Sequence, residues 1–154
     1  MKLDGTKESC TCSECQSYCQ HKPGWFLPGE AEQLALHLGI SLQDLFDSKL
    51  AVDWWVSNPD IFLLSPAIIS GEIGMEFPAN PRGDCIFFED DLCKIHPVRP
   101  FECRETFHNE NNDRLHKQIA DSWIPCQDQI IKLLGRQPKS KSFTIFDFLQ
   151  STHL

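Results

Sequence analysis

The sequence predicts an α+β fold, mostly helical, in one small domain with a short β-hairpin and a cysteine-bound metal centre. Apolar residues recur at helical spacing in several stretches, and two short β-prone runs flank the acidic turn at residues 89–91. Eight cysteines are present among 154 residues. A chain of this length suits a single hydrophobic core.

The first expected helices are identified by their spacing and their ends. Residues 29–38 form one helix, which stops at Gly39. Residues 42–50 form the next, with Ser41 as its N-cap. Residues 53–55 (DWW) follow at the end of that helix or just past it. They are interpreted as core with an exposed edge, although the paired tryptophans also suit a binding wall.

The middle of the chain is expected to be extended. Residues 61–69 (IFLLSPAII) predict one strand, or two short ones around Pro66. Glycines and prolines then indicate a loop over residues 70–83, with a short strand at residues 73–77.

The stretch CIFFEDDLCKIHPVRPFECR holds three of the cysteines. Its β-prone runs predict a hairpin with Cys85 and Cys93 on paired strands and residues 89–91 as a solvated turn. Pro100 suits the first turn of a helix that carries Cys103. The amino end of that helix would favour the thiolate form of this cysteine.

Three more helices are expected towards the end of the chain. The first lies within residues 109–123, which are polar at the start and then helical. The second is opened by Pro125 and Cys126 and ended by Gly135. The last follows a linker at residues 136–142 and carries an apolar, phenylalanine-rich face.

The first cysteines lie close together in the segment CTCSECQSYC. Cys12 and Cys15 have the Cys-x-x-Cys spacing at which one turn directs two sulfurs to one metal. Cys19 lies one helical turn beyond Cys15. Cys10 is interpreted as a spare thiol, and His21 as a surface histidine or a further ligand.

Charge and hydropathy narrow the class of protein. The net charge of −8 argues against nucleic acid and anionic membrane surfaces as main partners. The sequence shows no apolar stretch of signal-peptide or membrane-spanning length. A cytoplasmic location is therefore expected. In a reducing compartment, clustered cysteines indicate metal ligands more than disulfides.

The spacing of the cysteines leaves the identity of the metal open. Thiolates select zinc, copper(I) or iron–sulfur clusters over magnesium or calcium. Neither the paired spacing of a zinc finger nor the contiguous spacing of a bacterial ferredoxin is present beyond Cys19.

These residues resemble the YkgJ-like cysteine-cluster family, described as zinc- or iron-chelating domains. The family's first block is Cys-x-x-Cys-x-x-Cys-Cys. Cys12, Cys15 and Cys19 match it, and Tyr18 stands in place of its third cysteine. The second block is matched by the following residues: Cys85, Cys93-Lys-Ile95-His96, Arg99-Pro100 and Cys103-Arg104. The segment GEAEQLALHLGISLQDLF is similar to the family's connecting helices.

The resemblance covers residues 12–126 and implies a metal or iron–sulfur centre. Cys126 is similar to a later, less regular family cysteine. The expected metal ligands are Cys12, Cys15, Cys19, Cys85, Cys93, Cys103 and Cys126. An iron–sulfur cluster is favoured over a zinc or iron ion because more than four cysteines converge.

Two arginines are candidates for binding this cofactor. Arg99 and Arg104 can donate to cluster sulfur or hold an anionic group, or they can pair with Glu102, Glu105 or the acidic turn. The two roles are balanced for Arg99, and the structural one is favoured for Arg104. His96 is interpreted as a supporting residue more than a ligand.

The expected organisation has three parts: a flexible N-terminus at residues 1–9, a cysteine-cluster metal-binding domain at residues 10–135, and a linker with a C-terminal helix packed on that domain at residues 136–154. The leading functional hypothesis is a metal-binding protein with redox or metal-handling use and a redox or protein partner. The alternatives are an enzyme of the lysine-methylase-related type, because some longer relatives are linked to lysine methylation of flagellin, and a structural zinc module. Whether the chain is an enzyme stays open.

Overall fold

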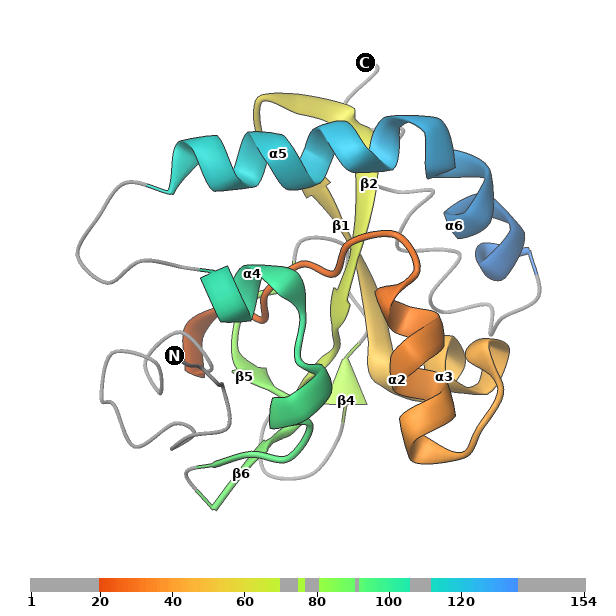
Figure 1. Ribbon diagram of the computed structural model, residues 1–154, viewed down its shortest axis with the longest axis vertical. Helices are drawn as coiled ribbons and strands as arrows, with labels where there is room; N and C mark the ends of the chain where they lie inside the picture. The colour runs from red at the N-terminus through yellow and green to blue at the C-terminus, as the bar shows by residue number, and fades with distance from the viewer. Residues whose placement is uncertain (1–19, 70–74, 77–80, 91, 106–111, 136–154) are drawn as a thin grey trace.

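The computed structural model describes residues 20–69, 75–76, 81–90, 92–105 and 112–135 (Figure 1). The expected flexible N-terminus, Cys10, Cys12, Cys15 and Cys19 lie outside these ranges, and so do the linker and C-terminal helix at residues 136–154.

The described residues confirm an α+β fold. The helices are α2 (Glu30–Leu38), α3 (Leu42–Lys49), α4 (Phe101–Glu105), α5 (Asp113–Trp123) and α6 (Gln127–Leu134), with 3₁₀ turns η1 (His96–Val98) and η2 (Ile124–Cys126). The strands are β1 (Leu50–Trp55), β2 (Asn58–Pro66), β3 (Ile68–Ile69), β4 (Met75–Glu76), β5 (Asp84–Cys85), β6 (Phe88–Glu89) and β7 (Leu92–Cys93).

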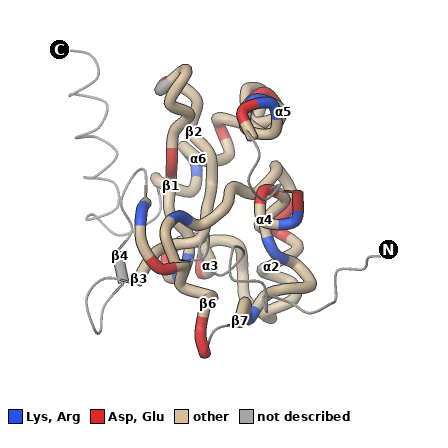
Figure 2. The backbone as a smooth tube through the Cα atoms, turned by 90° about the vertical axis from the view of Figure 1, so that its left-hand side faces the viewer, with Lys and Arg blue, Asp and Glu red and all other residues tan. Residues whose placement is uncertain are grey.

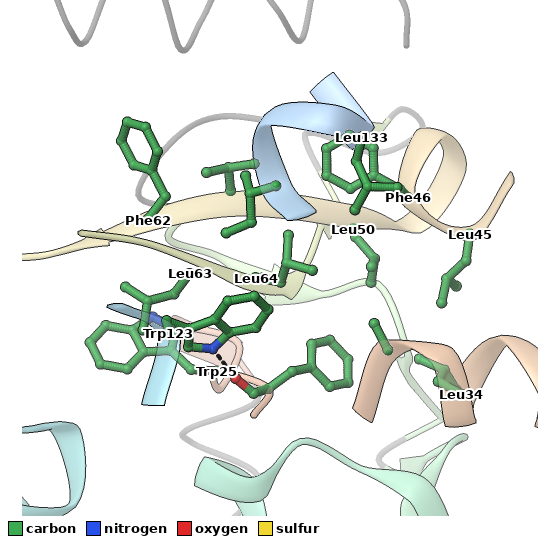
Figure 3. Close-up of a cluster of buried hydrophobic side chains, with 14 of the residues drawn as sticks. Trp25, Leu34, Leu45, Phe46, Leu50, Phe62, Leu63, Leu64, Trp123 and Leu133 are labelled. Atoms are coloured by element: carbon green, nitrogen blue, oxygen red, sulfur yellow. Dashed lines mark hydrogen bonds between the residues drawn. The ribbon is translucent and has the colours of Figure 1, made fainter. Parts of the chain in front are cut away.

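A long antiparallel hairpin, β1–β2, forms the centre of the described structure. Its register pairs Leu50 with Pro66 at one end and Trp54 with Phe62 near the other. Helices cover it on both faces (Figure 1). Trp25 and Trp123 pack on one face, and Phe46 and Leu133 pack on the other (Figure 3). Consecutive residues of β1 are therefore buried, and each large apolar side chain contributes about 1.5–3 kcal/mol.

The strand β1 corrects the interpretation of residues 50–55. The sequence extended the preceding helix to residue 50 and placed residues 53–55 at its end, but α3 stops at Lys49 and Leu50 is already in the strand. A short apolar run that is buried on both faces has no period-2 signature, so its periodicity cannot be distinguished from that of a helix. Pairing with β2 decides the outcome, and Val52 and the two tryptophans are residue types that suit such a strand.

The ends of the first two helices agree with the sequence. Gly39 follows α2 with a φ of 74°, and its N–H donates to the carbonyl oxygens of Ala35 and Leu36. Ser41 caps α3, where its side chain accepts from the Asp44 N–H at 3.0 Å.

Two small sheets follow the central hairpin. Residues 61–69 divide around Pro66 and Ala67 into β2 and β3, and β4 lies inside the expected strand at residues 73–77. In the first sheet, β3 pairs with both β4 and β5. The second sheet is the hairpin β6–β7, whose acidic tip stands out in Figure 2. Asp90 turns the chain there with a φ of 55°, which aspartate tolerates better than most residues.

The placement of Cys85 differs from the expectation. Only Cys93 lies in the β6–β7 hairpin, where it faces Phe88. Cys85 lies in β5 and faces Ile68. The chain changes partner between the two, since the Ile86 N–H donates to the Ala67 carbonyl whereas the Phe87 carbonyl accepts from the Lys94 N–H. Cys85 therefore pairs with the distant strand β3 and not with the strand of Cys93, as the expected hairpin required.

The later helices agree with the sequence more closely. Cys103 lies in α4, which begins directly after Pro100. Helix α5 occupies the second part of the expected 109–123 region. Pro125 and Cys126 form η2, which leads into α6, and Gly135 ends α6.

Candidate metal centre

Three of the expected cysteine ligands lie on three separate elements of the described structure, β5, β7 and α4. Cys85 is buried in β5, Cys93 is half-buried in β7, and Cys103 is exposed in α4. In the β6–β7 hairpin, Cys93 is paired with Phe88, and Phe88 lies only three residues after Cys85 in the sequence. No disulfide joins any two of the four cysteines that the structure describes.

Residues 20–25, which directly follow Cys19 in the sequence, run between two of these elements. In Figure 1 this segment, at the red end of the colour bar, passes beside α4 and β5. On the β5 side, the His21 carbonyl accepts from the Gly83 N–H at 2.8 Å. On the α4 side, the Glu102 N–H donates to the Trp25 carbonyl at 3.2 Å. Directly after the first cysteine block, the described chain therefore bonds to Gly83, two residues before Cys85, and to Glu102, the residue before Cys103.

Gly24 provides the closest approach in this region. A Cβ added to Gly24 would lie 2.6 Å from the Cys103 Sγ and 3.2 Å from the Cys103 backbone nitrogen. Carbon and sulfur do not approach so closely without displacement. The buried backbone of residue 24 thus forms one wall of the space that holds this sulfur.

The described residues alone do not complete a ligand set. Within residues 20–69, 75–76, 81–90, 92–105 and 112–135, no group of three or more histidine, cysteine, aspartate or glutamate side chains is arranged to hold a metal ion. The thiol chemistry of Cys85, Cys93 and Cys103 suits a soft metal, and the expected ligand set also includes sulfurs from the first block. Those sulfurs lie outside the described residues, so the seven-cysteine set stays a prediction.

Cys126 lies apart from the elements that carry the other three described cysteines. It ends η2 at the junction of α5 and α6, which Figure 1 shows on the far side of β2 from α4 and β5. There it packs against the hydrophobic core.

The two arginines take up structural contacts, Arg104 from α4 and Arg99 at the end of η1. Arg104 forms an ion pair with Glu30 at 2.8 Å and lies over the Phe101 ring. Its guanidinium also donates to the Arg99 carbonyl. Arg99 donates to the His96 carbonyl at 2.6 Å and lies 3.3 Å from the Nδ1 of the same histidine. Glu30 is the partner that the sequence did not suggest, and cofactor binding by Arg99 and Arg104 stays a prediction.

A polar cluster joins this region to the central hairpin. Asp53 is fully buried in β1, and its Oδ2 accepts from the Trp25 indole at 2.7 Å and from the Lys22 ammonium at 2.9 Å. The ammonium of Lys22 also lies 4.8 Å from the Trp25 ring centroid. The centroid of the Trp25 ring also lies 5.2 Å from that of the His116 ring. Segment 20–25 is therefore attached to β1 by charge-assisted hydrogen bonds.

Glu102 occupies the centre of the contacts between segment 20–25, α4 and α5. One carboxylate oxygen accepts from the Trp25 N–H at 2.8 Å, and the other lies 2.8 Å from the His116 Nε2. Burial acts to raise the pKa of Glu102. The hydrogen bond to His116 and the charge of Lys22 act in the opposite direction and leave the pKa of this carboxyl below its usual value.

Sequence reasoning missed most of this cluster. Asp53 carried a signal, because a carboxylate inside an apolar run must find partners if the run is buried. Lys22 and His116 carried none, since their partners Asp53 and Glu102 lie 31 and 14 residues away, beyond the reach of any local pattern.

Comparison with protein-family models, with curated proteins and with solved structures finds no match to this chain. None of the helices in the described ranges has the length and apolar character needed to cross a bilayer.

Proposed function

We propose that this chain is a metal-binding protein that holds an iron–sulfur cluster, or a zinc or iron ion, through a cysteine cluster of the YkgJ-like type. The ligands come from two blocks, residues 12–19 and residues 85–103. An iron–sulfur cluster is the first choice and a single ion the second, because the two blocks offer more sulfurs than one tetrahedral ion needs.

One observation carries the proposal. Segment 20–25 bonds to the Gly83 N–H beside β5 and abuts the Cys103 Sγ in α4. The described residue next to Cys19 therefore belongs to a segment that contacts α4 and the residue directly before β5. The chain that directly follows the first cysteine block thus contacts part of the second block, which lies more than sixty residues further along the sequence.

The chemistry favours redox or metal handling in a reducing compartment such as the cytoplasm. There thiols persist as ligands instead of forming disulfides. Hydrogen bonds and nearby charges set the potential of a thiolate-bound cluster, and β5, α4 and the polar cluster would supply them.

Anaerobic purification of the full chain, followed by metal and sulfide analysis and a visible absorption spectrum, tests the proposal. We expect a coloured protein with iron and acid-labile sulfide in equal amounts. Colourless protein with one zinc per chain would replace the cluster by a structural or handling zinc site. Protein without metal, after anaerobic reconstitution with Fe²⁺ and sulfide and after incubation with Zn²⁺, would overturn the proposal.

Chelation of the loaded protein separates structural use from handling. Metal-binding energy is folding energy where no site exists in the unfolded chain. Unfolding on chelator addition would indicate a structural centre. A folded apo-protein that takes the metal up again would indicate handling or redox use.

A further inference from the structure

We propose that Glu102 is a positioning residue that sets the geometry of the metal centre by holding segment 20–25 against α4. The inference rests on the proposed function and goes beyond it, since Glu102 binds no metal in this account. It acts through the two residues beside it, Cys103 in α4 and Trp25 in the facing segment.

Trp25 and Glu102 are joined by two hydrogen bonds, which connect segment 20–25 to α4. The Trp25 N–H donates to the Glu102 carboxylate, and the Glu102 N–H donates to the Trp25 carbonyl. Two bonds in opposite directions define the distance and the angle between the segments. Gly24 and Cys103 are the next residues on each side, so this pairing determines how closely backbone and sulfur approach.

The Glu102 carboxylate is itself held in place by partners on both of its oxygens. Its other oxygen pairs with His116 of α5, so one side chain connects segment 20–25, α4 and α5. Only 15% of the Glu102 side chain is exposed, so water replaces these contacts poorly. Removal of a residue that orients metal ligands without binding the metal typically weakens metal affinity about 10- to 100-fold.

Glu30 offers a matched control. Its side chain is also 15% exposed, and it also joins α4 to the segment before α2. Its carboxylate accepts from the N–H groups of Leu27 and Phe101 and pairs with Arg104. Glu30 is thus a comparably buried carboxylate that also accepts from backbone N–H groups and pairs with a basic side chain, but it contacts neither Gly24 nor Trp25.

The experiment compares metal affinity with stability in the full chain. The variants are E102A, E102Q and E30A, each titrated with Zn²⁺ in competition with a chromophoric chelator and each unfolded in urea as apo-protein. For E102A we expect a rise in the Zn²⁺ dissociation constant of about 10- to 100-fold. E30A should lose comparable stability but keep a dissociation constant close to that of the wild type. E102Q should recover most of the affinity, because its amide oxygen still accepts from the Trp25 N–H.

Amide hydrogen exchange gives a readout that does not depend on metal. Exchange over residues 20–25 should accelerate in E102A and stay slow in E30A. If E102A does not fold, E102D replaces it, since it keeps the charge but withdraws both oxygens by one methylene. The same weakening is then expected.

Two results would overturn the inference alone while the proposed function stands. In the first, the wild type binds Zn²⁺, and E102A and E30A lose equal Zn²⁺ affinity, in proportion to the stability that each variant loses. The other is an E102Q variant as weak as E102A. A wild type that binds no metal would instead remove the proposed function, and this inference with it.

Discussion

Gly24 lies directly against Cys103, so close that a single added carbon would stand 2.6 Å from its sulfur. The two residues are almost eighty positions apart in the sequence, and neighbouring Trp25 and Glu102, 77 positions apart, are hydrogen-bonded to each other. This contact brings the segment after the first cysteine block to the helix that carries the last cysteine of the second.

The Gly24 contact predicts a specific effect of one methyl group. The backbone φ of Gly24 is outside the left-handed region, so Gly24→Ala introduces a steric contact and no backbone strain. The Cys103 side chain must rotate or α4 must shift, at a cost of about 1–3 kcal/mol. We expect lower stability in urea unfolding and reduced metal content.

Gly135→Ala is the control for that substitution. Gly135 has a φ of −68°, and an added Cβ would meet its nearest neighbours at 3.6 Å, an ordinary contact. This variant should be as stable as the wild type, or more stable by about 0.4–1 kcal/mol, because alanine reduces the conformational entropy of the unfolded chain. Equal metal content in the two variants would contradict the proposed closeness of Gly24 to the centre.

The buried Asp53 predicts a large effect from an isosteric change. Its two oxygens accept from three donors, the Trp25 indole, the Lys22 ammonium and the Trp54 N–H. Asparagine has one acceptor oxygen, so in either orientation its NH₂ group faces a donor. Asp53→Asn should therefore lower the free energy of unfolding by about 2–4 kcal/mol.

Asp121→Asn tests whether that loss comes from burial. Asp121 also pairs with a lysine, Lys117, but both side chains are largely exposed. Removing this pair should cost only about 0.3–0.5 kcal/mol. Similar losses for the two variants, measured by urea unfolding at neutral pH, would show that the Asp53 contacts do not stabilise the hairpin.

The same residues show what the sequence could and could not predict. Local signals were sufficient for the caps of α2 and α3, for the helix after Pro100 and for the end of α6 at Gly135. They failed at Leu50 and Cys85, where pairing with β2 and β3 decides the conformation. Partners that lie 14 to 77 residues away determine the contacts of Lys22 and Glu102. No local pattern encodes such contacts, because tertiary packing selects them.

The lowered pKa of Glu102 predicts how stability depends on pH. Because the folded-state pKa lies below the usual value of 4.5, the unfolded chain takes up this proton first as pH falls. The stabilisation is fully present above the unfolded-state pKa and is lost as pH falls through the folded-state value. The charges that face Glu102 come from Lys22 and His116.

Glu102→Gln isolates this titration from the other carboxyl groups. The difference in unfolding free energy between wild type and variant should be largest at neutral pH and shrink below pH 4.5. Urea unfolding of apo-protein across that range measures it. A difference that stays constant as the pH falls would mean that the carboxylate is not held in its charged form by the fold.

The cysteines predict a graded series of metal contents. Cys85→Ser, Cys93→Ser and Cys103→Ser should each abolish loading, because serine is a poor ligand for the soft metals that thiolates select. Cys10→Ser should leave loading intact, as a spare thiol would. Full loading of Cys93→Ser, measured by metal analysis after anaerobic purification, would remove the basis of the metal proposal.

Cys126→Ser is the variant on which the family resemblance and the structure differ. The resemblance includes Cys126 among the ligands, whereas η2 lies apart from β5 and α4 in Figure 1. Its sulfur packs on the core, so the substitution should cost stability and leave the metal content unchanged. Leu133→Ala, a core change in the adjoining α6, provides the control for a purely structural loss. Loss of metal in Cys126→Ser but not in Leu133→Ala would show that Cys126 is a ligand and that the chain holds a second site.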